Sequence, residues 1–208
     1  ESRGPVVDGQ GSAARFEELQ AITMDASGNL YVLEGTGAIR RITPAGAVST
    51  VRQKTRNFGG GGAYDFVGFA RDAAGSFYLS VPGNGDNAVG FGHPAILKID
   101  AQGVESVYAG RQGVAGDADG TGSAAQFSGP RSPSLDANGN LVLLDTSTWG
   151  SRLHLGESRS LRRIAPDGGT TTLVRRDYEN PMIGTAVDAQ GNAYVGGGEF
   201  LHPLSGEH

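Results

Sequence analysis

Histidine is the residue of this sequence best suited to bind a ligand or a metal ion. All four histidines lie in three segments, 82–95, 146–160 and 196–208. A catalytic zinc ion often takes three protein ligands, so imidazoles from these segments could form a zinc site if they converge. The alternative is that histidine is an ordinary polar residue of long loops. We expect no cofactor, and we keep a divalent metal ion as the alternative.

Aromatic side chains lie in the same three segments, and one of them is Trp149, the only tryptophan of the chain. Aromatic residues dominate binding hot spots, so we expect Trp149 to be the strongest anchor for a ligand. The predicted binding surface consists of Phe91, His93, Trp149, His154, Phe200 and His202.

No catalytic motif accompanies these residues. The chain has no cysteine, no Gly-x-Ser-x-Gly nucleophile turn and no Gly-x4-Gly-Lys-Ser/Thr phosphate loop. Asp117 to Gly122 begins like a calcium loop, but it lacks a third ligand before its glycine and has Ser128 where an EF-hand carries glutamate. We therefore favour a binding protein over an enzyme and assign no catalytic residue.

A repeated phrase marks the elements that must position these segments. It reads Asp-Ala-x-Gly-Asn, or a close variant, at 25–29, 72–76, 136–140 and 188–192, each time between two apolar runs. Glycine supplies the positive φ that a tight hairpin needs, and the flanking runs are rich in β-forming residues. A second phrase, a basic residue followed by Ile-x-x-x-Gly, comes after the first three copies and predicts another turn.

Each unit thus reads as four short strands in an antiparallel meander. A period of roughly 45–60 residues with four strands is typical of a β-propeller. We predict an all-β chain without a helix longer than two turns, forming a single propeller domain over 1–208. Its repeats are 13–52, 64–109, 125–175 and an incomplete 180–208, which gives about three and a half four-stranded blades.

Alternation along the strands predicts which residues are buried. The predicted core residues are Leu30, Val32, Ile39, Ile42, Leu141, Leu143, Leu161 and Ile164. The arginine pairs 40–41 and 162–163 occupy equivalent positions in third strands, and we expect them to be exposed. Glu34 and Asp145 follow second strands, where a carboxylate could cap the next turn by accepting backbone N–H hydrogen bonds.

Charge and hydropathy exclude some classes of partner. The net charge is −5 and the isoelectric point is near 5.3, whereas surfaces that bind nucleic-acid phosphates are usually basic. We therefore expect no nucleic-acid partner. No run of 18 apolar residues is present, so we expect no membrane span.

Several phrases recur in one order, and in this respect the chain resembles the NHL-repeat family of β-propellers in its bacterial form. The match runs through 13–16, 22–32 and 39–51, and the third unit adds the linker 113–130. The segment 8–16 resembles the second half of that linker. The family includes RNA-binding modules, protein-interaction modules, extracellular scaffolds and a few lyases, so the resemblance implies the fold more strongly than the function.

The resemblance also implies a ring of five or six blades. Because the chain accounts for fewer, we expect further sequence or another chain, through self-association or otherwise, to complete the ring. We expect a protein of the extracellular space or periplasm whose partner is a protein or another extracellular ligand.

The variable connections predict where that partner binds. From the turn asparagine or serine to the third-strand basic residue there are 12 positions in the first unit, 22 in the second and 23 in the third. The excess lies between the second and third strands, so we expect the loops 82–95, 146–160 and 196–208 on one face. Loops on a rigid scaffold often carry function, and we favour a binding or scaffold role. The alternative is a metal-assisted lyase or an enzyme resembling a lactone hydrolase.

Overall fold

A computed structural model describes most of the chain. The described residues are 6–35, 37–53, 68–81, 94–111, 114–146, 158–177, 184–188, 190–196 and 202–204. Within these segments the chain is all-β, with β-strands, two 3-10 turns and no α-helix, which confirms the predicted fold class. The described part therefore also contains no helix that could cross a membrane.

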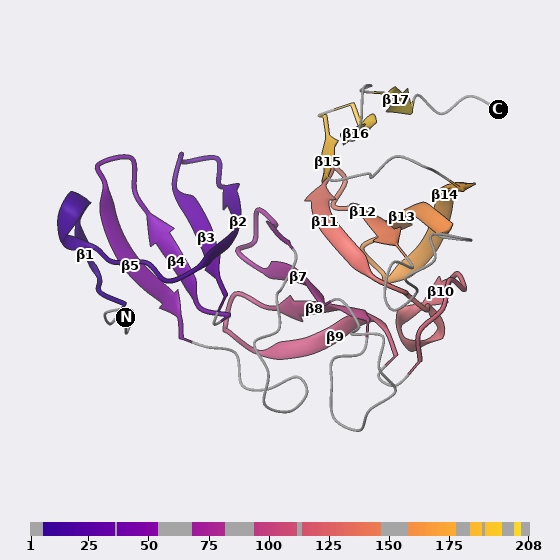
Figure 1. Cartoon of the computed structure of the whole chain (residues 1–208), viewed down its shortest axis with the longest axis horizontal. Coiled ribbons are helices and arrows are strands. Elements are labelled where there is room, and N and C mark those ends of the chain that lie inside the picture. The colour runs from indigo at the N-terminus through magenta and orange to yellow at the C-terminus, as the bar shows by residue number, and fades with distance from the viewer. Residues whose placement is uncertain are drawn as a thin grey trace.

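The strands form four antiparallel sheets, which follow one another along an arc and which we call the first to fourth blades in chain order (Figure 1). The first blade has the order β1-β5-β4-β3-β2 and consists of β1 (Gly9–Gln10), β2 (Leu19–Met24), β3 (Leu30–Glu34), β4 (Ile39–Ile42) and β5 (Ala47–Arg52). The second blade is a four-stranded meander of β6 (Phe69–Arg71), β7 (Phe77–Val81), β8 (Ala95–Ile99) and β9 (Glu105–Gly110).

The third blade repeats the five-stranded order of the first. It consists of β10 (Gly120–Thr121), β11 (Pro130–Leu135), β12 (Leu141–Thr146), β13 (Ser158–Ile164) and β14 (Gly169–Asp177). In both blades the extra strand comes from the preceding linker, which also forms a 3-10 turn, η1 (Gly11–Ala13) or η2 (Gly122–Ala124). The linker therefore adds its own strand to the outer edge of the blade that it leads into.

The fourth blade corrects one expectation. It contains β15 (Gly184–Val187), β16 (Ala193–Gly196) and a third strand, β17 (His202–Leu204), which pairs with β16. The expectation that 196–208 forms one long loop after two strands is therefore wrong. The connection is instead short, because His202 already lies opposite Val195, as Arg40 lies opposite Val32 in the first blade. Only the second and third blades carry enlarged connections between their second and third strands.

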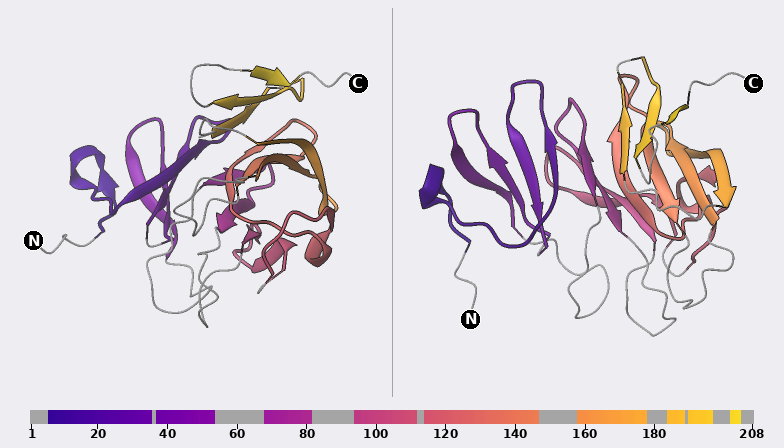
Figure 2. Two further views of the ribbon diagram at one scale, coloured as in Figure 1. Left: turned by 45° about the vertical axis from the view of Figure 1, so that its right-hand side comes forward. Right: turned by 45° about the horizontal axis from the view of Figure 1, so that its top comes forward.

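Neighbouring blades lie face to face (Figure 2). Apolar side chains pack between them. Tyr31, Leu33 and Ile39 of the first blade contact a cluster on the second blade that includes Leu79 and Leu97. A second cluster joins the second and third blades, and a third cluster joins the third and fourth. Each interior sheet therefore buries both of its faces, which is why its strands are apolar on both sides.

The repeated Asp-Ala-x-Gly phrase forms the same turn in each blade. Asp25 Oδ1 accepts hydrogen bonds from the backbone N–H groups of Ser27 and Asn29, and Gly28 has a φ of +77°. Asp72, Asp136 and Asp188 make equivalent contacts in the other blades. This phrase is therefore a structural turn motif that closes the first hairpin of each blade.

Six of the eight predicted core residues are buried, but Leu30 and Ile42 are only partly buried. Both lie on the face of the first blade that no other described blade covers. The same face exposes Ile22 by 62 %, whereas Phe69, its equivalent in the second blade, is 4 % exposed. The sequence pattern predicted the strands correctly but assumed a neighbouring sheet on this side.

Candidate functional site

A buried arginine organises the end of the first blade where its second strand finishes. Arg40 is fully buried, and its two terminal nitrogens donate to Glu34 and Asp8 at 3.1 and 2.8 Å. They also donate to the backbone oxygens of Val7 and Arg15, and the guanidinium lies 5.2 Å from the Phe16 ring centre. The arginine therefore fastens the incoming linker to the blade.

In the third blade, Arg162 makes the equivalent set of contacts. Arg162 donates to Asp145 and Asp119 at 3.1 and 3.0 Å, and to the backbone oxygens of Ala118 and Gln126. Its guanidinium lies 5.1 Å from the ring centre of Phe127. We call each set of arginine, two carboxylates and aromatic ring a linker clasp.

In both linker clasps the linker aspartate also holds the outer strand. Asp8 accepts hydrogen bonds from the backbone N–H and hydroxyl of Thr50, and Asp119 does the same with Thr172. The Thr50 N–H lowers the pKa of Asp8 from its usual value. For Asp119, burial raises the pKa, but the Thr172 and Arg162 contacts outweigh it and the pKa is lowered.

The second blade has no such charged set among its described residues. Val81 stands where Glu34 and Asp145 stand, and Leu97 stands at the arginine position, because Leu97 lies opposite Leu79 as Arg40 lies opposite Val32. Both side chains are buried in the cluster between the first and second blades. An apolar pair therefore stands in the second blade where the first and third blades have a carboxylate and an arginine.

These contacts correct one expectation. Arg40 and Arg162 are buried rather than exposed, because the incoming linker covers both side chains, in Arg40 even on the open face of the first blade.

Residue 36 and residues 147–157, which follow Glu34 and Asp145, lie outside the described part of the chain, so capping by these carboxylates stays a prediction. Their described contacts are with the linker and the clasp arginine. The two carboxylates accept N–H groups of the linker, at Glu17 and at Ser128 and Gly129. One sequence signal could have revealed the buried arginine–carboxylate pair. The second unit has an apolar residue at both positions, Val81 and Leu97.

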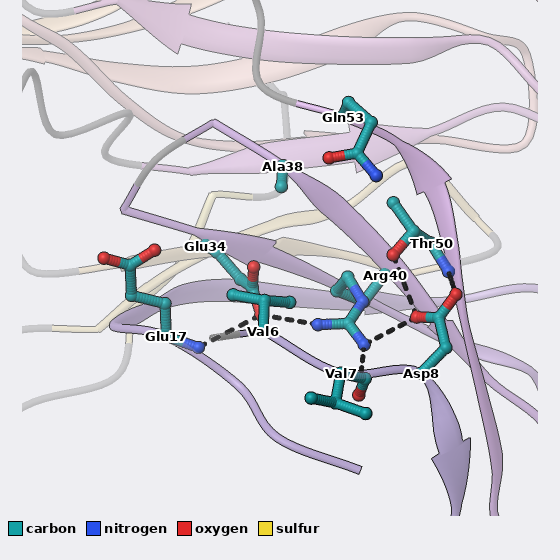
Figure 3. A pocket seen from close by; sticks show the side chains of 9 residues that line it. All are labelled: Val6, Val7, Asp8, Glu17, Glu34, Ala38, Arg40, Thr50 and Gln53. Atoms are coloured by element: carbon teal, nitrogen blue, oxygen red, sulfur yellow. Dashed lines mark hydrogen bonds and ion pairs between the residues drawn. The ribbon is translucent and has the colours of Figure 1, made fainter. Parts of the chain in front are cut away.

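The carboxylates of the two clasps differ in how fully they are satisfied. Asp145 accepts two backbone N–H groups on one oxygen and Arg162 on the other. Burial raises the pKa of Asp145, and these contacts only partly oppose that rise. In the first blade, Glu34 Oε1 takes both hydrogen bonds, and Oε2 is buried without a partner (Figure 3).

A pocket of about 470 Å³ lies beside the first clasp. It is lined by Val6, Val7, Asp8, Glu17, Glu34, Ala38, Arg40, Thr50 and Gln53, which Figure 3 shows. Its volume lies in the range of small-molecule sites. Its walls combine short apolar side chains with three carboxylates and one arginine, so it can accept a small molecule with polar and apolar parts.

Most of the residues predicted from the sequence to bind a ligand fall outside the described part of the chain. They are Phe91, His93, Trp149, His154 and Phe200. His202 lies in β17, at the strand position that Arg40 occupies in the first blade. Whether these side chains converge stays a prediction. The described residues contain no group of three histidine or acidic side chains that could hold a metal ion.

The strand ends that carry the enlarged loops are described. β7 ends at Val81 and β8 begins at Ala95, while β12 ends at Thr146 and β13 begins at Ser158. Both are second-to-third-strand connections, so they leave from the same end of two blades that pack together. The Asp-Ala-x-Gly turns lie at the opposite ends of these strands.

No family model matches the sequence, and no curated protein matches it. Solved structures do. A protein of unknown function from Bacteroides thetaiotaomicron VPI-5482 matches with a TM-score of 0.63 and 16 % identity, over 86 % of this chain and 44 % of its own. An auxiliary nutrient binding protein from Bacteroides ovatus ATCC 8483 matches with a TM-score of 0.61 and 15 % identity. The match covers 90 % of this chain and 48 % of that protein.

A putative gluconolactonase is also similar, with a TM-score of 0.54 and 15 % identity, over 91 % of this chain and 57 % of its own. At these identities the likeness shows the fold, which is a β-propeller. In each case this chain spans less than two thirds of the matched protein, so it corresponds to part of such a propeller.

Proposed function

We propose that this propeller chain is a non-enzymatic binding or scaffold module of the NHL type. It engages a protein or another extracellular ligand through the enlarged loops 82–95 and 146–160. The observation that supports this most is that both enlarged connections leave from the same end of two adjacent blades. A surface assembled in this way, by variable loops on a rigid sheet, is a common design for ligand binding.

The comparisons support binding as well as fold. One of the similar structures is an auxiliary nutrient binding protein, and it shares the arrangement of blades over 90 % of this chain. Binding of nutrients outside the cell would agree with an extracellular or cell-envelope location. The exposed face of the first blade further supports our expectation that another sheet, from the same or another chain, packs there.

The alternative function is a lyase or an enzyme that acts on lactones, and the similarity to a putative gluconolactonase favours this choice among enzymes. Such an enzyme would use a divalent metal ion held by His93, His154 or His202. Metal analysis of the purified protein separates the two proposals. Stoichiometric zinc or calcium that a chelator removes, and that a His154→Ala variant no longer retains, would favour the enzyme.

The single tryptophan provides a direct test of the binding proposal. Because Trp149 lies in one of the two enlarged loops, its fluorescence reports binding there without a label. We expect a saturable change when a panel of sugars and peptides is titrated. Isothermal titration calorimetry, which needs no tryptophan, should then show binding to Trp149→Ala weakened by tenfold or more, or about 1.4 kcal/mol. A ligand that binds equally well to Trp149→Ala would contradict the proposed anchor.

A further inference from the structure

The pocket beside the first linker clasp lies outside the enlarged loops, and nothing in the proposed binding function uses it. We propose that this pocket binds a small organic ammonium ion, namely a primary amine on a short aliphatic body. The inference depends on the first blade alone and stands independently of any ligand at Trp149.

Two residues that line the pocket stand where the third blade has an ion pair. In the third blade Arg175 pairs with Asp117. Arg175 lies three residues after Thr172, and Asp117 lies two residues before Asp119. The same steps from Thr50 and Asp8 lead to Gln53 and Val6, which both line the pocket. The first blade therefore has an uncharged pair at these positions, and both of its members line the pocket.

The arginine in the pocket wall is not available to an anion. Each terminal nitrogen of Arg40 already makes two contacts, one to a carboxylate and one to a backbone oxygen. Its Nε is buried without a partner, but the same is true of Arg162, so this feature is common to both clasps. The Thr50 hydroxyl is also used, because it donates to Asp8. A carboxylate or phosphate ligand would therefore meet acidic groups and few free donors.

The groups left over are acceptors. Glu34 is fully buried, and its Oε2 has no hydrogen-bond partner, whereas the equivalent Asp145 has both oxygens satisfied. Glu17 places a second carboxylate in the same wall, where Ser128 stands in the third blade (Figure 3). A buried acceptor without a donor is costly, so a ligand that supplies N–H groups gains affinity there.

The ligand class follows from this inventory. An ammonium group carries one positive charge and three donors, which suits the oxygens of Glu34 and Glu17 and the amide of Gln53. Val6, Val7 and Ala38 offer apolar contact for an aliphatic body. A metal ion fits less well, because no three acidic or histidine residues gather among the described residues.

The test is a titration of the isotope-labelled 208-residue chain with n-butylammonium chloride, followed by NMR at the backbone amides of Glu17, Gly35 and Thr50. We expect saturable shifts at these amides. Two probes of similar size, n-butanol and butyrate, should bind at least about tenfold more weakly. Butanol binding as tightly as the amine would overturn the proposal, since the carboxylates would then contribute nothing.

The chain itself supplies the matched variants. Val6→Asp with Gln53→Arg rebuilds the Asp117–Arg175 ion pair in the first blade and leaves the clasp intact, so the amine should no longer produce saturable shifts. Glu17→Gln should weaken binding by about tenfold. The reciprocal change in the third blade, Asp117→Val with Arg175→Gln, should leave amine binding unchanged. Retained binding in the folded Val6→Asp/Gln53→Arg variant would also overturn the proposal.

Discussion

The first and third blades fasten their linkers with a buried arginine, whereas the second blade fills the same position with leucine. In the two clasped blades the guanidinium joins a blade carboxylate, a linker carboxylate and two linker carbonyl groups. In the second blade Val81 and Leu97 pack with residues of the first blade. A four-stranded antiparallel meander forms with or without the clasp, whereas an additional linker strand is described only in the two clasped blades.

This difference shows that the charges act as a set. A buried ion pair is often no better than a well-packed apolar pair, but removing one partner is strongly destabilising because the other charge is left buried. The second blade has lost acid and base together, which is the change that avoids this cost. The clasps therefore serve mainly to position the linker, and the first linker forms one wall of the pocket.

The largest effect should come from breaking one clasp. Arg162→Ala leaves Asp145 buried without its partner and removes the donors to two linker carbonyls, so we expect a loss of about 3–5 kcal/mol in the free energy of unfolding. Urea denaturation measures it. Arg163→Ala, at the exposed neighbouring position, is the control and should change stability by no more than about 0.5 kcal/mol.

Converting a clasp to the pattern of the second blade should recover part of this loss. Arg162→Leu with Asp145→Val copies Leu97 and Val81, and it removes both buried charges. We expect the double variant to be more stable than Arg162→Leu alone, with a coupling energy of about 1–3 kcal/mol in the double-mutant cycle. Additive effects would show that the two side chains do not act as one unit.

The buried and open faces can be compared with one pair of core variants. Ile164 is fully buried between blades, whereas its equivalent Ile42 is only partly buried on the open face of the first blade. Ile164→Ala should cost about 2–5 kcal/mol, and Ile42→Ala clearly less. Equal losses in urea denaturation would mean that another sheet covers the first blade in solution.

The smallest effect should appear at the Asp-Ala-x-Gly turns, in acid. The pKa of Asp25 is lowered from 3.8 to about 2, first by the hydrogen bond from the Asn29 side chain. Desolvation raises the pKa, and the Asn29 N–H lowers it further. The pKa of Asp188 is lowered in the same way, first by Asn192. A lowered pKa stabilises the fold above the unfolded-state value and loses this contribution as pH falls through the folded-state value.

We therefore expect the stability advantage of the wild type over Asp25→Asn to shrink between about pH 4 and pH 2. Urea midpoints measured for both proteins across this range provide the comparison. An advantage that stays constant down to pH 2 would show that the charge of Asp25 contributes nothing to the turn.

The repeated phrases made most of the fold predictable. The Asp25 turn, its three copies and the strands around them follow directly from local chemistry, because aspartate and glycine favour this turn. The prediction that Arg40 and Arg162 are exposed is wrong, because strand alternation says nothing of the linker that covers both side chains. The number of strands in the fourth blade was also misread, since His202–Leu204 lacks the basic–Ile phrase that marks other third strands.

The candidate site was less predictable for a physical reason. The pocket arises from residues far apart in sequence, Val6, Glu17 and Gln53, none of which belongs to a recognisable motif. Only the comparison with Asp117, Ser128 and Arg175, once the strand register is known, shows what has changed. The six predicted binding residues stay a prediction, because the sequence specifies their segment and not their spatial arrangement.

Hydrogen–deuterium exchange with a ligand from the tryptophan-fluorescence screen tests the proposed binding function most directly, because it compares the two ends of the blades in one measurement. The account predicts protection in peptides that cover 82–95 and 146–160, with the turns 25–29, 72–76 and 136–140 unchanged. Protection at those turns, with the enlarged loops unaffected, would contradict it.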